Sequence, residues 1–227
     1  MYTFDEEYKE RLRRRLRALD KPRRLAFAIA CAERAFGPYR YYARQAYRGH
    51  PRYLRSTLNS LWELVLQRQI GHKLPFLDDG ERLIPLSVIQ ADKEIEEACL
   101  YKEPHELDIL ADDPVCALLY ACRCELRGDV QSAVWAATRD YELVTSIALH
   151  LDQRAKRKFY RAHSDYDVID QLDYVQTELQ QQVRDLEDLT QCQAGNGYVQ
   201  LIRSLRSRAQ RQGRTLQGIV MSLTNEI

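Results

Sequence analysis

Apolar residues recur at intervals of three and four along most of this 227-residue chain, the spacing of one face of an α-helix. The clearest series lies in the second half and comprises Val134, Ala137, Tyr141, Val144, Ala148 and Leu151. A later series repeats the spacing with Val168, Leu172, Val175, Leu179, Val183 and Leu186. Each series predicts a helix packed along its length against a neighbour.

Start and stop signals divide the rest of the chain into further helices. Residues 2–18 predict a basic amphipathic helix, and Asp20 is placed to cap a second one, which Gly37-Pro38 interrupts with a kink or corner. A third helix follows the turn at residues 49–51 and ends near residue 71. A fourth is expected over residues 88–101.

The later helices are bounded by similar signals. Asp112 or Asp113 before Pro114 predicts a helix start, Gly128 a stop, and Asp129 a new cap. A final basic helix is expected after residues 195–197, ending at about residue 212. Strand signals are nearly absent.

The sum of these segments is an all-α fold, a single bundle of roughly seven to nine mostly antiparallel helices. The expected organisation is a basic amphipathic N-terminal helix (1–20), a helical bundle domain (21–212) and a C-terminal tail (213–227). Residues 71–86, with two prolines and an Asp-Asp-Gly turn signal, are a candidate internal corner.

Composition supports a globular chain without a membrane span. Hydrophobic residues make up 45% and charged residues 30%, and no apolar stretch approaches the roughly 20 residues needed to cross a bilayer. No signal peptide is recognisable at the start, so a cytoplasmic location is expected. The six cysteines are then expected to be reduced thiols.

Charge is unevenly distributed, although the net charge is +1. Residues 1–72 hold 16 Lys/Arg against 7 Asp/Glu, a balance of +9, and residues 73–227 hold 18 against 26, a balance of −8. The two parts either compensate each other within one fold or display opposite faces to partners.

Two segments of the first helices carry a family resemblance. The run from Leu25 to Tyr39 and the run from Leu58 to Glu63 resemble the opening of the YjaG-like bacterial family of helical proteins of unknown function. Looser likeness extends over about residues 12–220. The resemblance implies an all-helical cytosolic fold and no known activity. In these runs Trp62 is interpreted as a core anchor, and Glu33 with Arg34 as structural ion pairs to neighbouring helices.

The sequence contains no familiar enzyme signature, and no catalytic residue, metal site or cofactor is expected. Cys122 and Cys124 are two apart in a predicted helix and point to nearly opposite faces, so they do not readily share a metal. Asp170 and Asp173 are one helical turn apart. They could hold a cation or act as an acid/base pair, but a solvated face or a surface for a basic partner is favoured.

Two features favour binding over catalysis. Tyrosines alternate with arginines over residues 38–53, the residue types of interface hot spots and of nucleic-acid contacts. Residues 78–142 hold 16 acidic against 6 basic residues and would suit a cationic groove on a partner.

The favoured hypothesis is a protein-interaction module that binds and neutralises another protein, most concretely a bacterial toxin immunity protein. Its predicted contact residues are Asp78, Asp79, Glu94, Glu96, Glu97, Asp165, Asp167, Asp170, Asp173, Tyr41, Tyr42 and Arg44. One alternative is a nucleic-acid binder that uses the basic N-terminal region, namely Arg11, Arg13, Arg14, Arg15 and Arg17 with the Tyr/Arg segment. Another is an enzyme with an unrecognised helical site.

Overall fold

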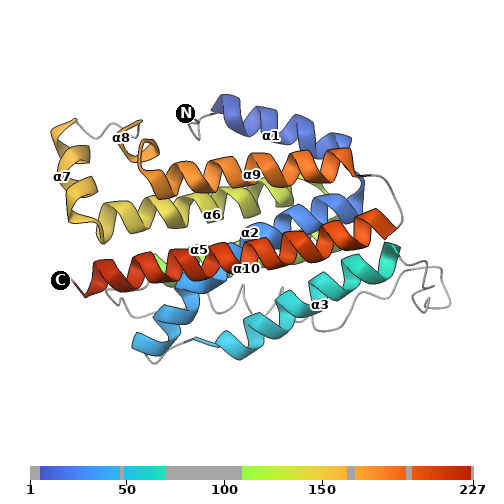
Figure 1. Cartoon of the computed structure of the whole chain (residues 1–227), viewed down its shortest axis with the longest axis horizontal. Helices are drawn as coiled ribbons and strands as arrows, with labels where there is room; N and C mark the ends of the chain where they lie inside the picture. The colour runs from blue at the N-terminus through green and yellow to red at the C-terminus, as the bar shows by residue number, and fades with distance from the viewer. Residues whose placement is uncertain (1–5, 47–48, 70–108, 163–166, 193–195, 226–227) are drawn as a thin grey trace.

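The fold is known from a computed structural model that describes the chain except for residues 1–5, 47–48, 70–108, 163–166, 193–195 and 226–227. Every regular element within the described residues is a helix, and Figure 1 shows long rods lying side by side, which confirms the predicted all-α bundle. The helices are α1 (Glu6–Ala18), α2 (Lys21–Gln45), α3 (Pro51–Gln69), α5 (Ile109–Arg127), α6 (Val130–His150), α7 (Gln153–Arg161), α8 (Asp167–Asp170), α9 (Asp173–Gln191) and α10 (Asn196–Thr224).

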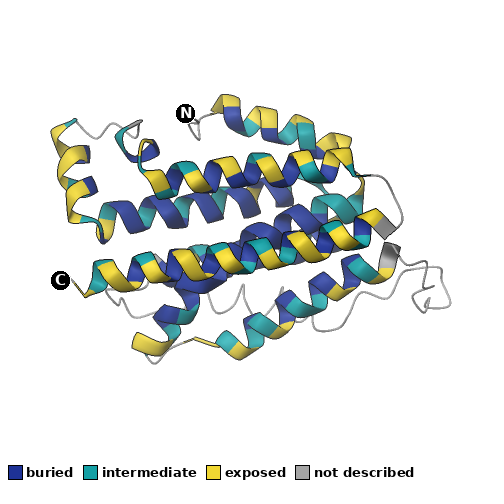
Figure 2. Cartoon of the chain, viewed as in Figure 1, coloured by how far each residue is buried: buried dark blue, intermediate teal, exposed yellow. Residues whose placement is uncertain are grey.

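Helix α2 occupies the centre of the bundle. It contacts α3, α5, α6, α9 and α10, and nearly all of its side chains from Leu25 to Tyr42 are buried (Figure 2). A helix that is apolar on every side has to be covered on every side. Because alanines fill much of its first half, the surrounding helices can approach closely.

Local sequence signals set several helix ends as expected. The side chain of Asp20 accepts a hydrogen bond from the Arg23 amide at 2.9 Å, and that of Asp129 accepts one from the Ser132 amide at 2.6 Å. Each interaction satisfies an amide that the first turn of a helix leaves without a partner. Gly128 has φ +68°, a left-handed conformation that glycine adopts without strain, and it ends α5 before Asp129 caps α6.

The predicted interruption at Gly37-Pro38 lies inside one helix. Helix α2 continues past Pro38 to Gln45, and Figure 1 shows its last turns bending away from the axis of the first ones. Proline removes only the amide that would bond the Arg34 carbonyl, so a helix can bend and continue where packing supports it. Of the two predicted outcomes, α2 shows the kink, and the helix does not end at Gly37-Pro38.

The single helix expected over residues 168–186 is divided into α8 and α9. Leu172 has an extended backbone with φ −70° and ψ 136° at the junction. Asp170 is buried there: its carboxylate accepts from the Tyr141 hydroxyl at 2.6 Å, and its backbone carbonyl accepts from the Gln176 amide group at 2.6 Å. These tertiary contacts stabilise a break that the apolar spacing does not indicate.

Helix ends differ from the predictions in two further places. Helix α10 continues to Thr224, so the segment predicted as a tail from residue 213 is helical, and Leu216 and Val220 on it are buried. Helix α5 begins at Ile109, before the predicted start at Asp112 or Asp113, and Pro114 lies inside it.

The predicted corner at 71–86 and the predicted helix at 88–101 lie outside the described residues. Helix α7 was not predicted.

Candidate functional site

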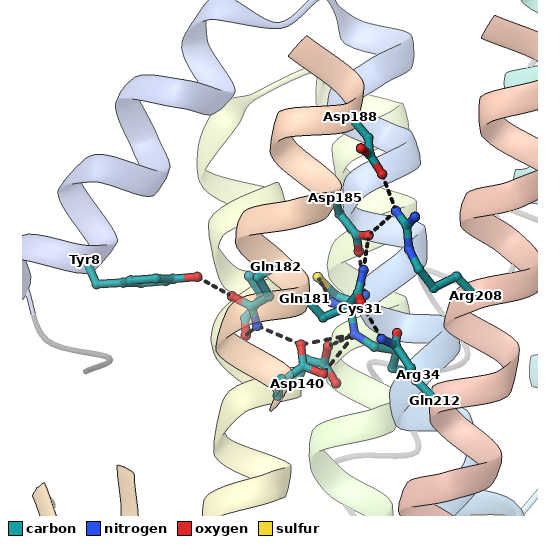
Figure 3. A network of polar contacts seen from close by, with 12 residues as sticks. Tyr8, Cys31, Arg34, Asp140, Gln181, Gln182, Asp185, Asp188, Arg208 and Gln212 are labelled. Carbon is teal, nitrogen blue, oxygen red and sulfur yellow. Dashed lines mark hydrogen bonds and ion pairs between the residues drawn. The ribbon is translucent and has the colours of Figure 1, made fainter. Parts of the chain in front are cut away.

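A buried arginine lies at the junction of α2, α6 and α9. Arg34 on α2 is 1% exposed. Its Nε donates to Asp140 on α6 and to Glu178 on α9, each at 3.0 Å, and its Nη1 donates to Asp185 on α9 at 2.7 Å (Figure 3). Its Nη2 lies 3.2 Å from the Cys31 sulfur. The guanidinium fork therefore joins three helices through charge-assisted hydrogen bonds.

Three carboxylates face one guanidinium in this cluster, and burial makes that imbalance costly. The pKa of Asp140 is raised well above its usual value, first by burial and then by the charge of Glu178. A proton held on Asp140 reduces the excess negative charge around Arg34. The pKa of Cys31 is also raised by burial, so its thiol stays protonated and is a poor nucleophile.

A second arginine extends the cluster to α10. Arg208 donates through Nη2 to Asp185 at 2.7 Å and to Asp188 at 2.8 Å (Figure 3). On the other side, Gln182 receives a hydrogen bond from the Tyr8 hydroxyl at 3.2 Å, and Gln182 donates to Glu178 at 3.1 Å. The polar network thus reaches from α1 through α9 to α10. Its many partners favour a role in fixing the packing of these helices.

An apolar cavity of about 380 Å³ opens between α9 and α10 and reaches this cluster. Arg34 and Glu178 line its inner end, while Val144, Leu216 and Ile219 contribute apolar surface. Of the predicted contact acids, Asp173 lines this cavity and is exposed.

The other predicted contact residues differ in accessibility. Tyr41 and Tyr42 are buried, and the Tyr41 hydroxyl lies 2.6 Å from the Thr224 hydroxyl of α10. Asp170 is buried as described above. The side chains of these three residues therefore do not form a contact surface, because they pack inside the bundle. Arg44 is exposed in the last turn of α2.

The side chains of the remaining predicted contact acids lie outside the described residues: Asp78, Asp79, Glu94, Glu96, Glu97, Asp165 and Asp167.

The structure confirms the predicted role of Trp62 as a core anchor. It is fully buried on α3, and its Nε1 donates to Glu33 of α2 at 3.0 Å. Glu33 also accepts from Arg55 of α3. Glu33 and Arg34 therefore form ion pairs to helices on different sides of α2, as the sequence indicated.

Two of the arginines of α1 make polar contacts within the fold, and the other three are exposed. Arg13 donates to Glu10 at 3.1 Å and to Gln131 of α6 at 3.3 Å, and Arg15 lies 4.0 Å from Glu187 of α9. Arg11, Arg14 and Arg17, three further residues of the nucleic-acid hypothesis, are exposed.

A surface cluster of aromatic residues and arginine lies across α5 and α6, and sequence reasoning missed it. The rings of Tyr120 and Trp135 are 5.0 Å apart, and the Arg123 guanidinium lies 6.0 Å from the Tyr120 ring. Trp135 is 40% exposed. Beside this pair, Arg139 contacts Asp113 at 3.3 Å. An indication was available, because Trp135 directly follows Val134 of the apolar series and must point to another face.

The partners of Arg34 were also missed, although the sequence carried a signal. Asp140 lies between Ala137 and Tyr141 of one apolar series, and Glu178 directly precedes Leu179 of the other. A charged side chain beside the buried face of a helix is expected to have a partner. Spacing within each helix cannot say which residue that partner is.

Within the described ranges no group of three or more His, Cys, Asp or Glu is arranged to hold a metal ion. The same part of the chain includes no helix with the length and apolar character of a membrane span.

Comparison with known proteins shows that part of the chain is similar to one protein family. Residues 11–87, about a third of the chain, match the family described as "Protein of unknown function (DUF416)". The crystal structure of a DUF416 family protein from Shewanella baltica OS155 is similar, with a TM-score of 0.57 and 17% sequence identity over 87% of this chain and 92% of that chain. At this identity the likeness shows a shared fold. No curated protein matches the chain.

Proposed function

We propose that this chain is a protein-interaction module that binds and neutralises a partner protein. The observation that supports the proposal is the cluster of Tyr120, Arg123 and Trp135 on the surface of α5 and α6. Tryptophan, tyrosine and arginine dominate binding hot spots because they combine a large apolar area with hydrogen-bonding groups. Arg139 and Asp113 supply charged groups beside them, the arrangement of an apolar centre with a polar rim.

The most concrete form of this proposal is a bacterial toxin immunity protein that acts in the cytoplasm. In this proposal the match to the DUF416 family reflects a relationship of this chain to the YjaG-like proteins. Such a protein holds its target in a tight, stoichiometric complex, in which charged rim residues speed association and buried anchors slow dissociation. Exposed acids such as Asp173 remain candidate contacts with a basic target.

The test is quantitative recovery of a partner on the tagged full-length chain from its native cells. Substituting Trp135→Ala should reduce partner affinity by at least about tenfold, as expected for a hot-spot residue. Tyr160→Ala is the matched control, because Tyr160 is a 64% exposed aromatic residue on a different helix, α7. Both variants should melt close to the parent chain. Recovery of no stoichiometric partner, or equal recovery on the Trp135→Ala variant, would reject the proposal.

The toxin form has its own assay. Expression of the recovered partner should arrest growth, and co-expression of this chain should restore it. The Trp135→Ala variant should protect less well than the Tyr160→Ala variant. A partner that is harmless when expressed alone would leave the interaction in place and remove the immunity function.

A second candidate, nucleic-acid binding, is favoured by α7. This nine-residue helix carries five Lys or Arg residues beside the exposed ring of Tyr160. Cationic side chains next to an exposed aromatic ring suit a single-stranded backbone with stacked bases. In filter binding, retention of RNA or DNA that falls steeply with salt and is lost in Tyr160→Ala would favour this function over the first.

A further inference from the structure

A polar cavity of about 240 Å³ lies between α2, α3 and α10, and it shares no lining residue with the surface cluster of α5 and α6. Three arginines from three different helices line it: Arg40 of α2, Arg55 of α3 and Arg214 of α10. Glu33 is the one acidic lining residue, so the lining carries a net charge of +2. Asn59 and Gln210 add amide groups to the wall.

The single carboxylate does not neutralise this group of cations. Glu33 is committed to Arg55 and to the indole of Trp62. Arg40 donates to the neutral side chain of Gln217, at 2.8 Å from Nη2. Among the described residues no hydrogen bond or ion pair involves Arg214, whose side chain is exposed. Two guanidinium groups therefore lie at the cavity without a described acidic partner.

The arginines are close enough to affect one another. The pKa of Arg40 is lowered, first by burial and then by the positive charges of Arg44, Arg55 and Arg214. Like charges held together raise the free energy of the folded state unless an anion lies between them. This crowding is consistent with a site whose counter-charge is supplied by a ligand.

A close backbone contact holds two walls of the cavity in place. A Cβ atom added to Gly37 would lie 1.8 Å from the Gly213 carbonyl oxygen, so α2 and α10 touch through their backbones at this point. Arg40 follows Gly37 by three residues and Arg214 follows Gly213 directly. The helix crossing therefore fixes the backbone positions from which Arg40 and Arg214 extend, which limits the backbone ordering needed to bind an anion.

We propose that this cavity binds a small phosphate-bearing dianion. A phosphate monoester carries about −1.5 to −2 charges at pH 7, which matches the net charge of the lining. Planar guanidinium groups donate paired hydrogen bonds to phosphate oxygens. A cavity of about 150 Å³ is enough for benzene, so the present one has room for a phosphate group and a small substituent. The amides of Asn59 and Gln210 would contact that substituent.

The test is isothermal titration of the full-length chain with inorganic phosphate and with glycerol 3-phosphate, with malonate as a carboxylate dianion. Both phosphates should bind, more tightly than malonate, and affinity should decrease with salt. Arg214→Gln should weaken phosphate binding by at least about tenfold, as expected for a lost charge-assisted contact. Because Arg214 is exposed, this variant should fold.

Arg203→Gln is the matched control. Arg203 is an exposed arginine on the same face of α10, 11 residues earlier, which places it roughly 16 Å from Arg214 along the helix axis. This variant should bind phosphate as the parent chain does. Absence of phosphate binding, equal losses in both variants, or tighter binding of malonate than of phosphate would each overturn the proposal.

Discussion

Arg34 shows how a charge can be stabilised in the middle of an apolar helix. Burial alone disfavours its guanidinium, yet its pKa is raised well above the usual value because Glu178, Asp140 and Asp185 surround it. A lysine could not make the same contacts as Arg34. An ammonium group is a point charge and lacks the planar, forked guanidinium that donates hydrogen bonds to two helices at once. The residue therefore acts by tying helices together.

Replacing this arginine should destabilise the whole chain. The substitution Arg34→Met keeps much of the side-chain volume but leaves Asp140 and Glu178 buried without their cation, while Asp185 keeps its contact with Arg208. We expect a loss of about 3–5 kcal/mol in the free energy of unfolding, measured by urea denaturation. Arg203→Gln, an exposed site, should change it by less than about 0.5 kcal/mol. A loss below about 1 kcal/mol for Arg34→Met would show that the cluster contributes little.

Asp113 should give stability a pH dependence opposite to that of an ordinary ion-paired acid. Burial raises its pKa from 3.8 to about 6, although Arg139 lies 3.3 Å away and opposes the shift. Between pH 4 and 6 the unfolded carboxyl has lost its proton while the folded one retains it. The folded state then binds more protons, so this contribution to stability decreases as pH rises through the window and levels off above it.

The variant Asp113→Asn removes this titration. Relative to the parent chain, it should gain about 2 kcal/mol in unfolding free energy between pH 4 and pH 7, since one pKa unit corresponds to about 1.4 kcal/mol. Urea denaturation of both proteins at pH 4, 5, 6 and 7 measures the difference. A difference that stays constant with pH, or that changes with the opposite sign, would mean that attraction to Arg139 outweighs burial.

At the scale of helices, the crossing of α2 and α10 depends on two glycines. The Cβ of any other residue at Gly37 would overlap the Gly213 backbone, and one at Gly213 would lie 2.8 Å from the Arg34 carbonyl oxygen. That carbonyl is the one whose helical partner is missing at Pro38. Glycine and proline, which usually end helices, here allow one helix to bend and another to lie directly on it.

Gly37→Ala should therefore separate α2 from α10. We expect a loss of about 3 kcal/mol or more in unfolding free energy, because the added methyl group meets backbone that cannot rotate away. Gly218→Ala is the control on α10, where an added Cβ meets nothing within 4 Å. It should raise stability by about 0.5–1 kcal/mol, since alanine favours helix over glycine. Thermal and urea unfolding of the two variants compare these effects. Equal stability of both variants would contradict the close crossing.

Prediction at this scale succeeded where a helix carried its own signals. The caps at Asp20 and Asp129 and the stop at Gly128 depend on hydrogen bonds within a few residues, and all three were predicted. Prediction was wrong where a distant contact decided the outcome. The break near Leu172 accompanies burial of Asp170 beside Tyr141, 29 residues away, and no local pattern indicates that contact.

At the scale of the molecule, part of the charge asymmetry is compensated by ion pairs within the fold. Cations of the first 72 residues pair with acids of the remainder: Lys21 lies 3.6 Å from Glu125, and Arg34 contacts Asp140, Glu178 and Asp185. These pairs support the interpretation that the two parts of the chain compensate each other within one fold. The arginines around the cavity of α2, α3 and α10 are not compensated in this way: Arg55 pairs with Glu33 of the same part of the chain, and Arg40 and Arg214 have no described acidic partner.

The sequence by itself determined the fold class, the main helices and their buried faces, because helical periodicity and capping depend on neighbours within a turn or two. It also indicated that Glu33, Arg34 and Trp62 have structural partners. Tertiary structure alone decided which partners these are, which tyrosines are exposed, and which arginines converge on one cavity. The reason is physical: those pairings join residues on different helices, and the order of residues along each helix does not encode which other helix it will face.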